Sequence, residues 1–101
     1  MKVSFDESGG YAGLLKGCEI DTSALPPEKA KELEQLVKAS GISASGEFLS
    51  DLSRDLHQYE ITIEEGASKI SAIFDGESIP QSAKPLIGYL KKCSKPRARD
   101  Q

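Results

Sequence analysis

The chain has no tryptophan, one histidine and two cysteines in 101 residues. His57 stands alone, and Cys18 and Cys93 are far apart, so the closely spaced ligands of a zinc site are missing. We interpret His57 as an ordinary surface or strand-end histidine. Without CxxC spacing, both cysteines are expected to be free thiols without a function. The sequence therefore predicts no metal site and no cofactor.

Long apolar runs are also missing. The apolar stretches are only a few residues long, far short of the about 20 residues that a membrane-spanning helix needs. Alternating strand residues, rather than an apolar signal segment, follow Met1 and Lys2. We therefore expect a cytoplasmic protein that does not contact membranes.

Basic residues are too few for a nucleic-acid-binding surface. The net charge is −3, and basic side chains cluster only near the C-terminus, at Lys91, Lys92, Lys95, Arg97 and Arg99. Lysines in the last turn of a helix interact favourably with the helix dipole, and the residues beyond it fray readily. A helix end followed by a disordered tail over 96–101 explains this cluster better than a nucleic-acid arm does.

Motifs of catalysis are absent. The sequence contains no HExxH, GxSxG, Walker or dinucleotide-binding glycine motif, and no nucleophile with an evident base. The paired carboxylates Asp6-Glu7 and Glu64-Glu65 flank predicted turns, where solvated acids are common. We expect a binding protein without catalytic residues, and an enzyme that uses surface carboxylates is the less favoured alternative.

Residues 2–21 are the most informative part of the sequence, because they have the pattern of two strands joined by a glycine-rich turn. Val3 and Phe5 alternate with polar residues, which is the period of a half-buried strand. Ser8-Gly9-Gly10 then marks a turn, since glycine adopts positive φ without a Cβ clash. In the returning strand, Gly13 and Gly17 predict bulges or a close backbone approach.

The turn presents Tyr11 and is our candidate binding site. Loops that carry function are commonly held by a rigid scaffold, and a plain hairpin turn is the open alternative. The predicted partner-binding residues are Glu7, Ser8, Gly9, Gly10, Tyr11, Ala12, Gly13 and Leu14.

A helix is predicted over 26–40. Prolines favour its first turn, and an apolar stripe follows at Ala30, Leu33, Leu36 and Val37. Gly41 is a natural terminator. The spacing of the apolar residues from Phe48 to Leu56 then fits a short second helix.

Three acids would line one face of that short helix, at Glu47, Asp51 and Asp55. The chain has no glycine-rich calcium loop around them and no histidine at helical spacing. A solvated acidic face therefore explains them better than a cation site does.

A second hairpin and a terminal helix complete the pattern. Residues 59–63 and 70–74 alternate on either side of a turn at Gly66. A helix over 81–93 follows, and Pro85 fits only its first turn, which moves the start to Ala83 or Lys84.

These elements predict an α+β fold with the order ββαββα. Strand pairs that alternate with single helices favour a four-stranded antiparallel sheet with two helices packed on one face. A chain of this length is about one domain, which we place at 1–95. The predicted core consists of Val3, Phe5, Leu33, Leu36, Val37, Ile61, Ile63, Ile70, Phe74, Leu86, Ile87 and Leu90.

Several short motifs, in their order and spacing, resemble the emfourin family. They are VSFDESGGYAG, CEIDTSALPPEKAKELEQLV, HQYEITIEEG and DGESIPQSAKPLIGYLKK, which together cover nearly the whole chain. The most specific elements are Ser8-Gly9-Gly10 with Tyr11 and Gly13, Leu25-Pro26-Pro27, Gln58-Tyr59, and Asp75-Gly76 before Ile79-Pro80.

The resemblance implies a bacterial, cytoplasmic inhibitor of thermolysin-like, and especially protealysin-like, zinc metalloproteases. Such an inhibitor binds its protease stoichiometrically, performs no chemistry and is expected to be a monomer when free. A catalytic zinc site keeps one coordination position open, and a loop held by two strands can occupy the surrounding cleft at low entropic cost. We expect Tyr11, Leu14 or Leu15 to be the apolar anchor. Asp6, Glu7 or a carbonyl near Gly10 is a candidate to approach the metal.

One alternative function stays open. A non-enzymatic adaptor could accept a partner strand on an exposed edge of the sheet, at residues 59–64 or 69–75. Inhibition of a purified zinc protease would distinguish the inhibitor from this adaptor.

Overall fold

The computed structural model describes residues 1–9, 14–50 and 57–96. Strand β1 (Lys2–Gly9) pairs with β2 (Leu14–Asp21), and β4 (Gln58–Glu65) pairs with β5 (Ser68–Asp75), so both predicted hairpins are confirmed. Gly66 in the second turn has a φ of +61°, which favours glycine. The bulge predicted at Gly17 is wrong, because this residue pairs with Asp6 in regular antiparallel register.

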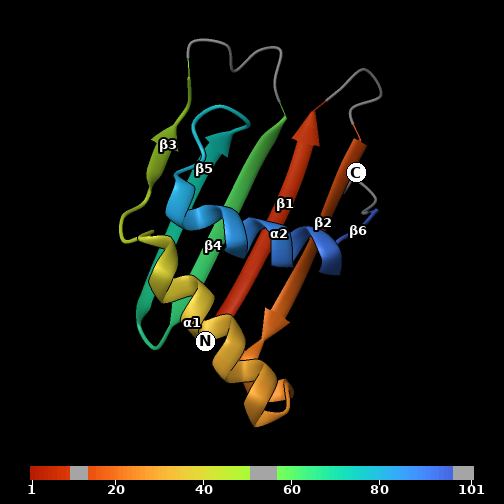
Figure 1. The fold of residues 1–101 in the computed structure, drawn as a ribbon, viewed down its shortest axis with the longest axis vertical. Coiled ribbons are helices and arrows are strands. Elements are labelled where there is room, and N and C mark those ends of the chain that lie inside the picture. Colours follow the sequence, from red (N-terminus) through yellow and green to blue (C-terminus); the bar gives the residue numbers. More distant parts are fainter. Residues whose placement is uncertain (10–13, 51–56, 97–101) are drawn as a thin grey trace.

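The sheet has six strands in the order β3-β5-β4-β1-β2-β6, with the two hairpins joined through β1 and β4 (Figure 1). Strand β3 (Gly46–Phe48) is parallel to β5, and β6 (Lys95–Pro96) is antiparallel to β2. The prediction of a four-stranded, purely antiparallel sheet is therefore wrong in strand number and in the direction of β3. Strands of three and two residues are too short to show a period of two.

The short helix predicted from Phe48 to Leu56 is wrong at its start. Phe48 lies in β3, where its ring stacks on Phe74 with the ring centroids 5.4 Å apart. This contact fixes the short strand against β5. Residues 51–56, and with them Asp51 and Asp55 of the predicted acidic face, lie outside the described residues.

The positions of the strands also correct the predicted docking edges. Residues 59–64 belong to β4, which pairs with β1 on one side and β5 on the other. Their backbone groups are therefore already used within the sheet. Along β5, residues 72–74 are paired with β3, so the predicted edge is covered over these three residues, and β3 does not pair with residues 69–71.

The helices predicted over 26–40 and 81–93 are confirmed. Helix α1 (Pro27–Ser40) begins with a proline in its first turn and ends at Gly41, which has a φ of +76°. A short 3₁₀ helix, η1 (Thr22–Ala24), joins β2 to α1, and another, η3 (Gln81–Ala83), precedes α2. Helix α2 (Lys84–Cys93) starts at Lys84, as the position of Pro85 predicted. The two helices lie across the same face of the sheet (Figure 1).

The core fills the space between the helices and this face of the sheet. Its fully buried side chains include Val3, Phe5 and Ile61 from the central strands and Leu33 and Leu86 from the helices. Most of the predicted core is confirmed, but Leu36 and Ile70 are only half-buried. Three further buried apolar residues were not predicted to be in the core, namely Tyr59, Ala72 and Ala83.

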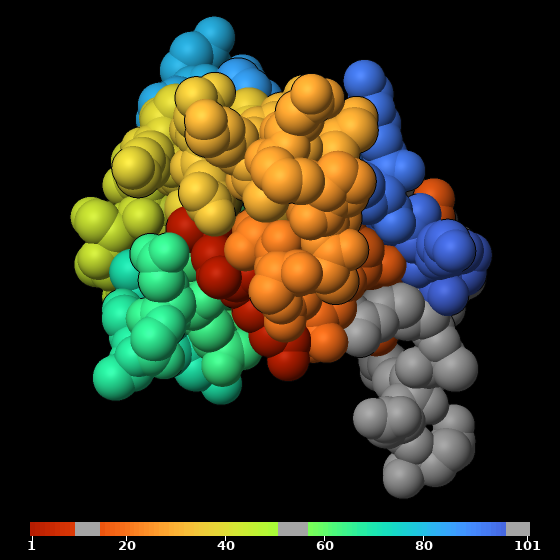
Figure 2. All heavy atoms as spheres, turned by 90° about the horizontal axis from the view of Figure 1, so that it is seen from below, coloured from red at the N-terminus to blue at the C-terminus, as the bar shows by residue number. Residues whose placement is uncertain are grey.

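The two ends of the described chain are both tied to the sheet. Met1 packs against the core, and its amino group donates to Thr22 Oγ1 at 3.1 Å. Figure 2 shows the N-terminal residues between the β4–β5 turn and the segment that leads into α1. At the other end, Pro96 of β6 pairs with Lys16, so the tail predicted as disordered from residue 96 starts with a paired residue. Residues 97–101 lie outside the described part.

Candidate functional site

The predicted site lies at the end of the β1–β2 hairpin. The last pair of the hairpin joins Gly9 to Leu14 and encloses residues 10–13. Gly9 has a φ of +132°, a conformation that residues with a Cβ rarely adopt. Glu7, Ser8 and Gly9 therefore form the end of β1, and Leu14 begins β2. The other predicted site residues, Gly10, Tyr11, Ala12 and Gly13, lie outside the described residues.

Three strands hold the base of this hairpin end. Ser8 pairs with Leu15 on β2 and with Gln58 on β4, and Glu7 has partners on the same two strands. Because β1 has a hydrogen-bonded neighbour on each side, its last residues are fixed by the sheet. The sheet therefore fixes the two points between which the predicted binding segment runs.

Glu7 makes a contact that the sequence did not indicate. Its Oε2 atom lies 3.0 Å from Nδ1 of His57, the residue that precedes β4. The Glu7 side chain is 17% exposed and that of His57 is 53% exposed. His57 is thus at a strand end and exposed, as predicted, but it is also the partner of a predicted site residue. Glu7 would have to leave this contact before its carboxylate could approach a metal.

An aromatic pair lies beneath the site on the helix side of the sheet. The rings of Phe5 and Tyr59 are stacked with their centroids 6.1 Å apart and an interplanar angle of 11°. Lys91 of α2 places Nζ 4.8 Å from the centroid of the Tyr59 ring and 3.3 Å from its hydroxyl oxygen. These contacts fasten the last turn of α2 to the end of the sheet that carries the hairpin. Alternation with Ile61 and Ile63 was the signal that could have added Tyr59 to the core.

Asp75 organises the same end of the sheet on the β5 side. Its fully buried carboxylate accepts hydrogen bonds from Ser50 N at 2.6 Å and Ser50 Oγ at 2.7 Å, and from the backbone N–H groups of Glu77 and Ser78. Burial opposes ionisation of this carboxyl, but the hydrogen bonds outweigh burial and lower its pKa from 3.8 to about 2. Asp75 is therefore a charged structural residue. The sequence marked Asp75-Gly76 as a turn but gave no sign of the contact with Ser50.

Within residues 1–9, 14–50 and 57–96, no group of three or more histidine, cysteine, aspartate or glutamate side chains could hold a metal ion. Cys18 is half-buried and Cys93 is exposed, and both are free thiols as predicted. No helix in this part of the chain is long and apolar enough to cross a membrane.

The fold and the site define a small α+β protein that presents a glycine-rich hairpin from a helix-covered sheet. A family model described as Emfourin matches residues 5–91, so the chain belongs to the Emfourin family. Comparisons with curated proteins and with solved structures gave no match. The resemblance seen in the sequence motifs is confirmed, and membership in an inhibitor family points to binding of a metalloprotease rather than to catalysis.

Proposed function

We propose that this protein is a stoichiometric inhibitor of thermolysin-like, and especially protealysin-like, zinc metalloproteases. The observation that carries the proposal is the Emfourin match over residues 5–91, which spans both helices and both hairpins almost completely. The free inhibitor is proposed to be a cytoplasmic monomer that needs no cofactor.

The β1–β2 hairpin end is the proposed inhibitory element. A catalytic zinc site keeps one coordination position open, in a cleft that accepts an extended chain. The segment between Gly9 and Leu14 starts and ends on paired strands, which supports its presentation to such a cleft from a fixed base. Tyr11 is the proposed anchor in an apolar specificity pocket, because aromatic side chains dominate many interfaces.

Occlusion of the cleft, rather than ligation of zinc, is the proposed mode of inhibition. Glu7 is engaged by His57, and Asp6 lies on the sheet face away from the helices, opposite Glu60. To bind zinc, Glu7 would first have to lose its contact with His57, and Asp6 would have to leave its position opposite Glu60. Occlusion of the cleft requires neither change.

The test is a titration of a thermolysin-like protease with the purified protein, followed by cleavage of a quenched fluorescent peptide. Activity should fall linearly to near zero at one equivalent when the protease concentration is well above the dissociation constant. Recovery of intact inhibitor after prolonged incubation would separate inhibition from simple competition by a substrate. Absence of inhibition for a panel of such proteases would contradict the proposal.

A further inference from the structure

Helix α2 has an exposed face on which three lysines surround a glycine. Lys84 lies one turn before Gly88, and Lys91 and Lys92 lie one turn after it, so the four residues share one side of the helix, and all are exposed. The other side of α2 is buried against the sheet. Helix α2 contains no acidic residue. This face therefore concentrates positive charge in a chain whose net charge is −3.

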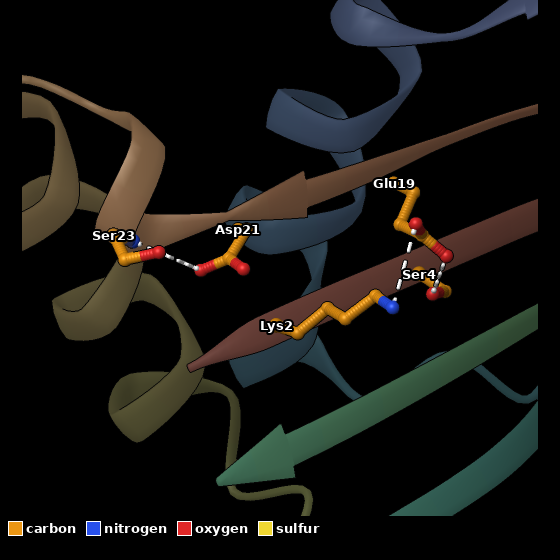
Figure 3. A network of polar contacts seen from close by, with 5 residues as sticks. All are labelled: Lys2, Ser4, Glu19, Asp21 and Ser23. Atoms are coloured by element: carbon orange, nitrogen blue, oxygen red, sulfur yellow. Dashed lines mark hydrogen bonds and ion pairs between the residues drawn. The ribbon is translucent and has the colours of Figure 1, made fainter.

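The charge of these lysines is not neutralised by the described part of the chain. Lys91 contacts the ring and the hydroxyl group of Tyr59, and none of the three lysines forms an ion pair with a described residue. On the sheet, by contrast, Lys2 Nζ lies 3.5 Å from Glu19 Oε1 (Figure 3). The cations of α2 are therefore available to a second molecule.

The helix dipole explains only part of this pattern. Lys91 and Lys92 lie in the last turn of α2, where a cation stabilises the helix. Lys84 is the first residue of α2, where a cation is unfavourable, and the first turn contains no acid to offset it. The position of Lys84 is therefore not explained by the stability of the free protein.

Gly88 is a second feature that the free protein does not explain. Glycine is among the least favourable residues in the interior of a helix. A Cβ at this position would meet no heavy atom within 4 Å from the other described elements, and Gly88 is not among the glycines with positive φ. Neither packing nor backbone conformation therefore requires glycine here. An exposed glycine does allow the backbone of another molecule to approach closely.

This face of α2 is continuous with the hairpin end. Helix α2 crosses the sheet between α1 and the end that carries the β1–β2 hairpin (Figure 1). On β2, the Sγ atom of Cys18 lies 3.6 Å from the carbonyl oxygen of Leu90 in α2. The exposed Lys16 lies two positions nearer to the hairpin and on the same side of the sheet as Cys18. A protein bound at the hairpin end therefore also faces these cations.

We propose that Lys16 and the exposed face of α2, with Gly88 at its centre, dock against an acidic surface beside the active-site cleft of the inhibited protease. Cations without an internal partner complement carboxylates on that surface, and Gly88 leaves room for its backbone. Such complementarity accelerates association and fixes the orientation in which the hairpin arrives. The inference rests on the proposed function and adds a second contact surface to it.

The charge contribution is tested by the association rate constant with a thermolysin-like protease that the wild type inhibits, measured at low and at physiological salt. A double variant with Lys84→Gln and Lys92→Gln should associate about threefold or more slowly at low salt and depend less on salt. The matched control, Lys29→Gln with Lys31→Gln, removes two exposed lysines of α1 and causes the same change in net charge. It should retain the wild-type rate.

Gly88→Gln separates a binding role of this position from a structural one. Glutamine is a good helix former, so the variant should unfold at a higher temperature than the wild type. Its side chain fills the space above the helix backbone, so the inhibition constant should rise about tenfold or more. A merely structural role of Gly88 would instead couple weaker inhibition to a less stable fold.

Four outcomes would contradict the inference, and they differ in what they leave standing. Wild-type association and inhibition for both α2 variants would overturn it and retain the inhibitor proposal. An equal loss in the α1 control would show that net charge alone explains the effect. Unchanged inhibition together with binding to phosphatidylserine vesicles through these lysines would assign the surface to an anionic membrane. Absence of inhibition by the wild type would contradict the proposed function and this inference with it.

Discussion

His57 Nδ1 lies 3.0 Å from Glu7 Oε2, and this contact joins the residue before β4 to the end of β1. One position further along, Ser8 and Gln58 continue the pairing of the two strands. The hairpin end that carries the proposed inhibitory segment is thus braced by a side-chain contact as well as by the sheet. The contact is an ion pair when the imidazole is protonated and a hydrogen bond when it is neutral.

A double-mutant cycle with Glu7→Gln and His57→Ala should measure a weak coupling, about 0.2–1 kcal/mol in the free energy of unfolding, because the histidine is half exposed. Chemical denaturation of the four proteins gives this value. Strict additivity of the two single changes would show that the contact does not persist in solution.

The lowered pKa of Asp75 predicts how the stability of the fold depends on pH. Its pKa is lowered from 3.8 in the unfolded chain to about 2 in the fold, so its stabilising contribution is complete above 3.8 and is lost as pH falls from 3.8 to about 2. Asp75→Asn should be less stable at neutral pH and should show a flatter stability profile in this window. Denaturation at several pH values measures both effects. The control Glu65→Gln, at the exposed end of β4, should keep the steeper profile of the wild type.

Substitutions of two leucines in α1 test how this helix packs on the sheet. Leu33 is fully buried and Leu36 is half-buried, one turn apart. Leu33→Ala should destabilise the protein by about 2–5 kcal/mol, and Leu36→Ala by about 1–2 kcal/mol, because less surface is lost from the core. Denaturant titrations should give this order, and equal losses would contradict the observed orientation of α1.

Neither cysteine is expected to contribute to binding. Cys93 is exposed at the end of α2, and Cys18 Sγ is 3.6 Å from the carbonyl oxygen of Leu90. A variant with Cys18→Ala and Cys93→Ser should inhibit a sensitive protease within about threefold of the wild type, which corresponds to less than about 1 kcal/mol. If the variant folded but no longer inhibited the protease, at least one of the two thiols would contribute to binding.

The long elements of the fold could be predicted from local patterns. In α1, apolar residues three and four apart and Gly41 at the end gave both the helix and its boundary. In the hairpins, alternation and glycine turns predicted four strands, each of which spans eight residues in the structure. The periodicity of apolar residues predicts an element correctly where one face of that element is buried over its whole length.

The short strands and the tertiary contacts could not be predicted in this way. Strand β3 depends on the stacking of Phe48 on Phe74, and β6 has only two residues, one of them Pro96. The contacts from His57 to Glu7 and from Ser50 to Asp75 join residues 50 and 25 positions apart in the sequence. Local spacing contains no information about such pairs, because they depend on the order of strands in the sheet.

The central claim is that the β1–β2 hairpin end inhibits the protease. Gly9 and Gly66 both have positive φ, in the hairpin of the proposed site and in the other hairpin. Gly9→Val and Gly66→Val therefore both impose backbone strain, each at one hairpin, and only the first change should impair inhibition. Tyr11→Ala, which removes the proposed anchor, should weaken inhibition by about 2 kcal/mol.

The most direct measurement is the inhibition constant of the wild type and of these three variants against one thermolysin-like protease, with folding checked by circular dichroism. The account predicts strong inhibition by the wild type and by Gly66→Val, and much weaker inhibition by folded Tyr11→Ala and Gly9→Val. Full inhibition by a folded Tyr11→Ala, Gly9→Val double variant would contradict it and would move the inhibitory surface to another part of the protein.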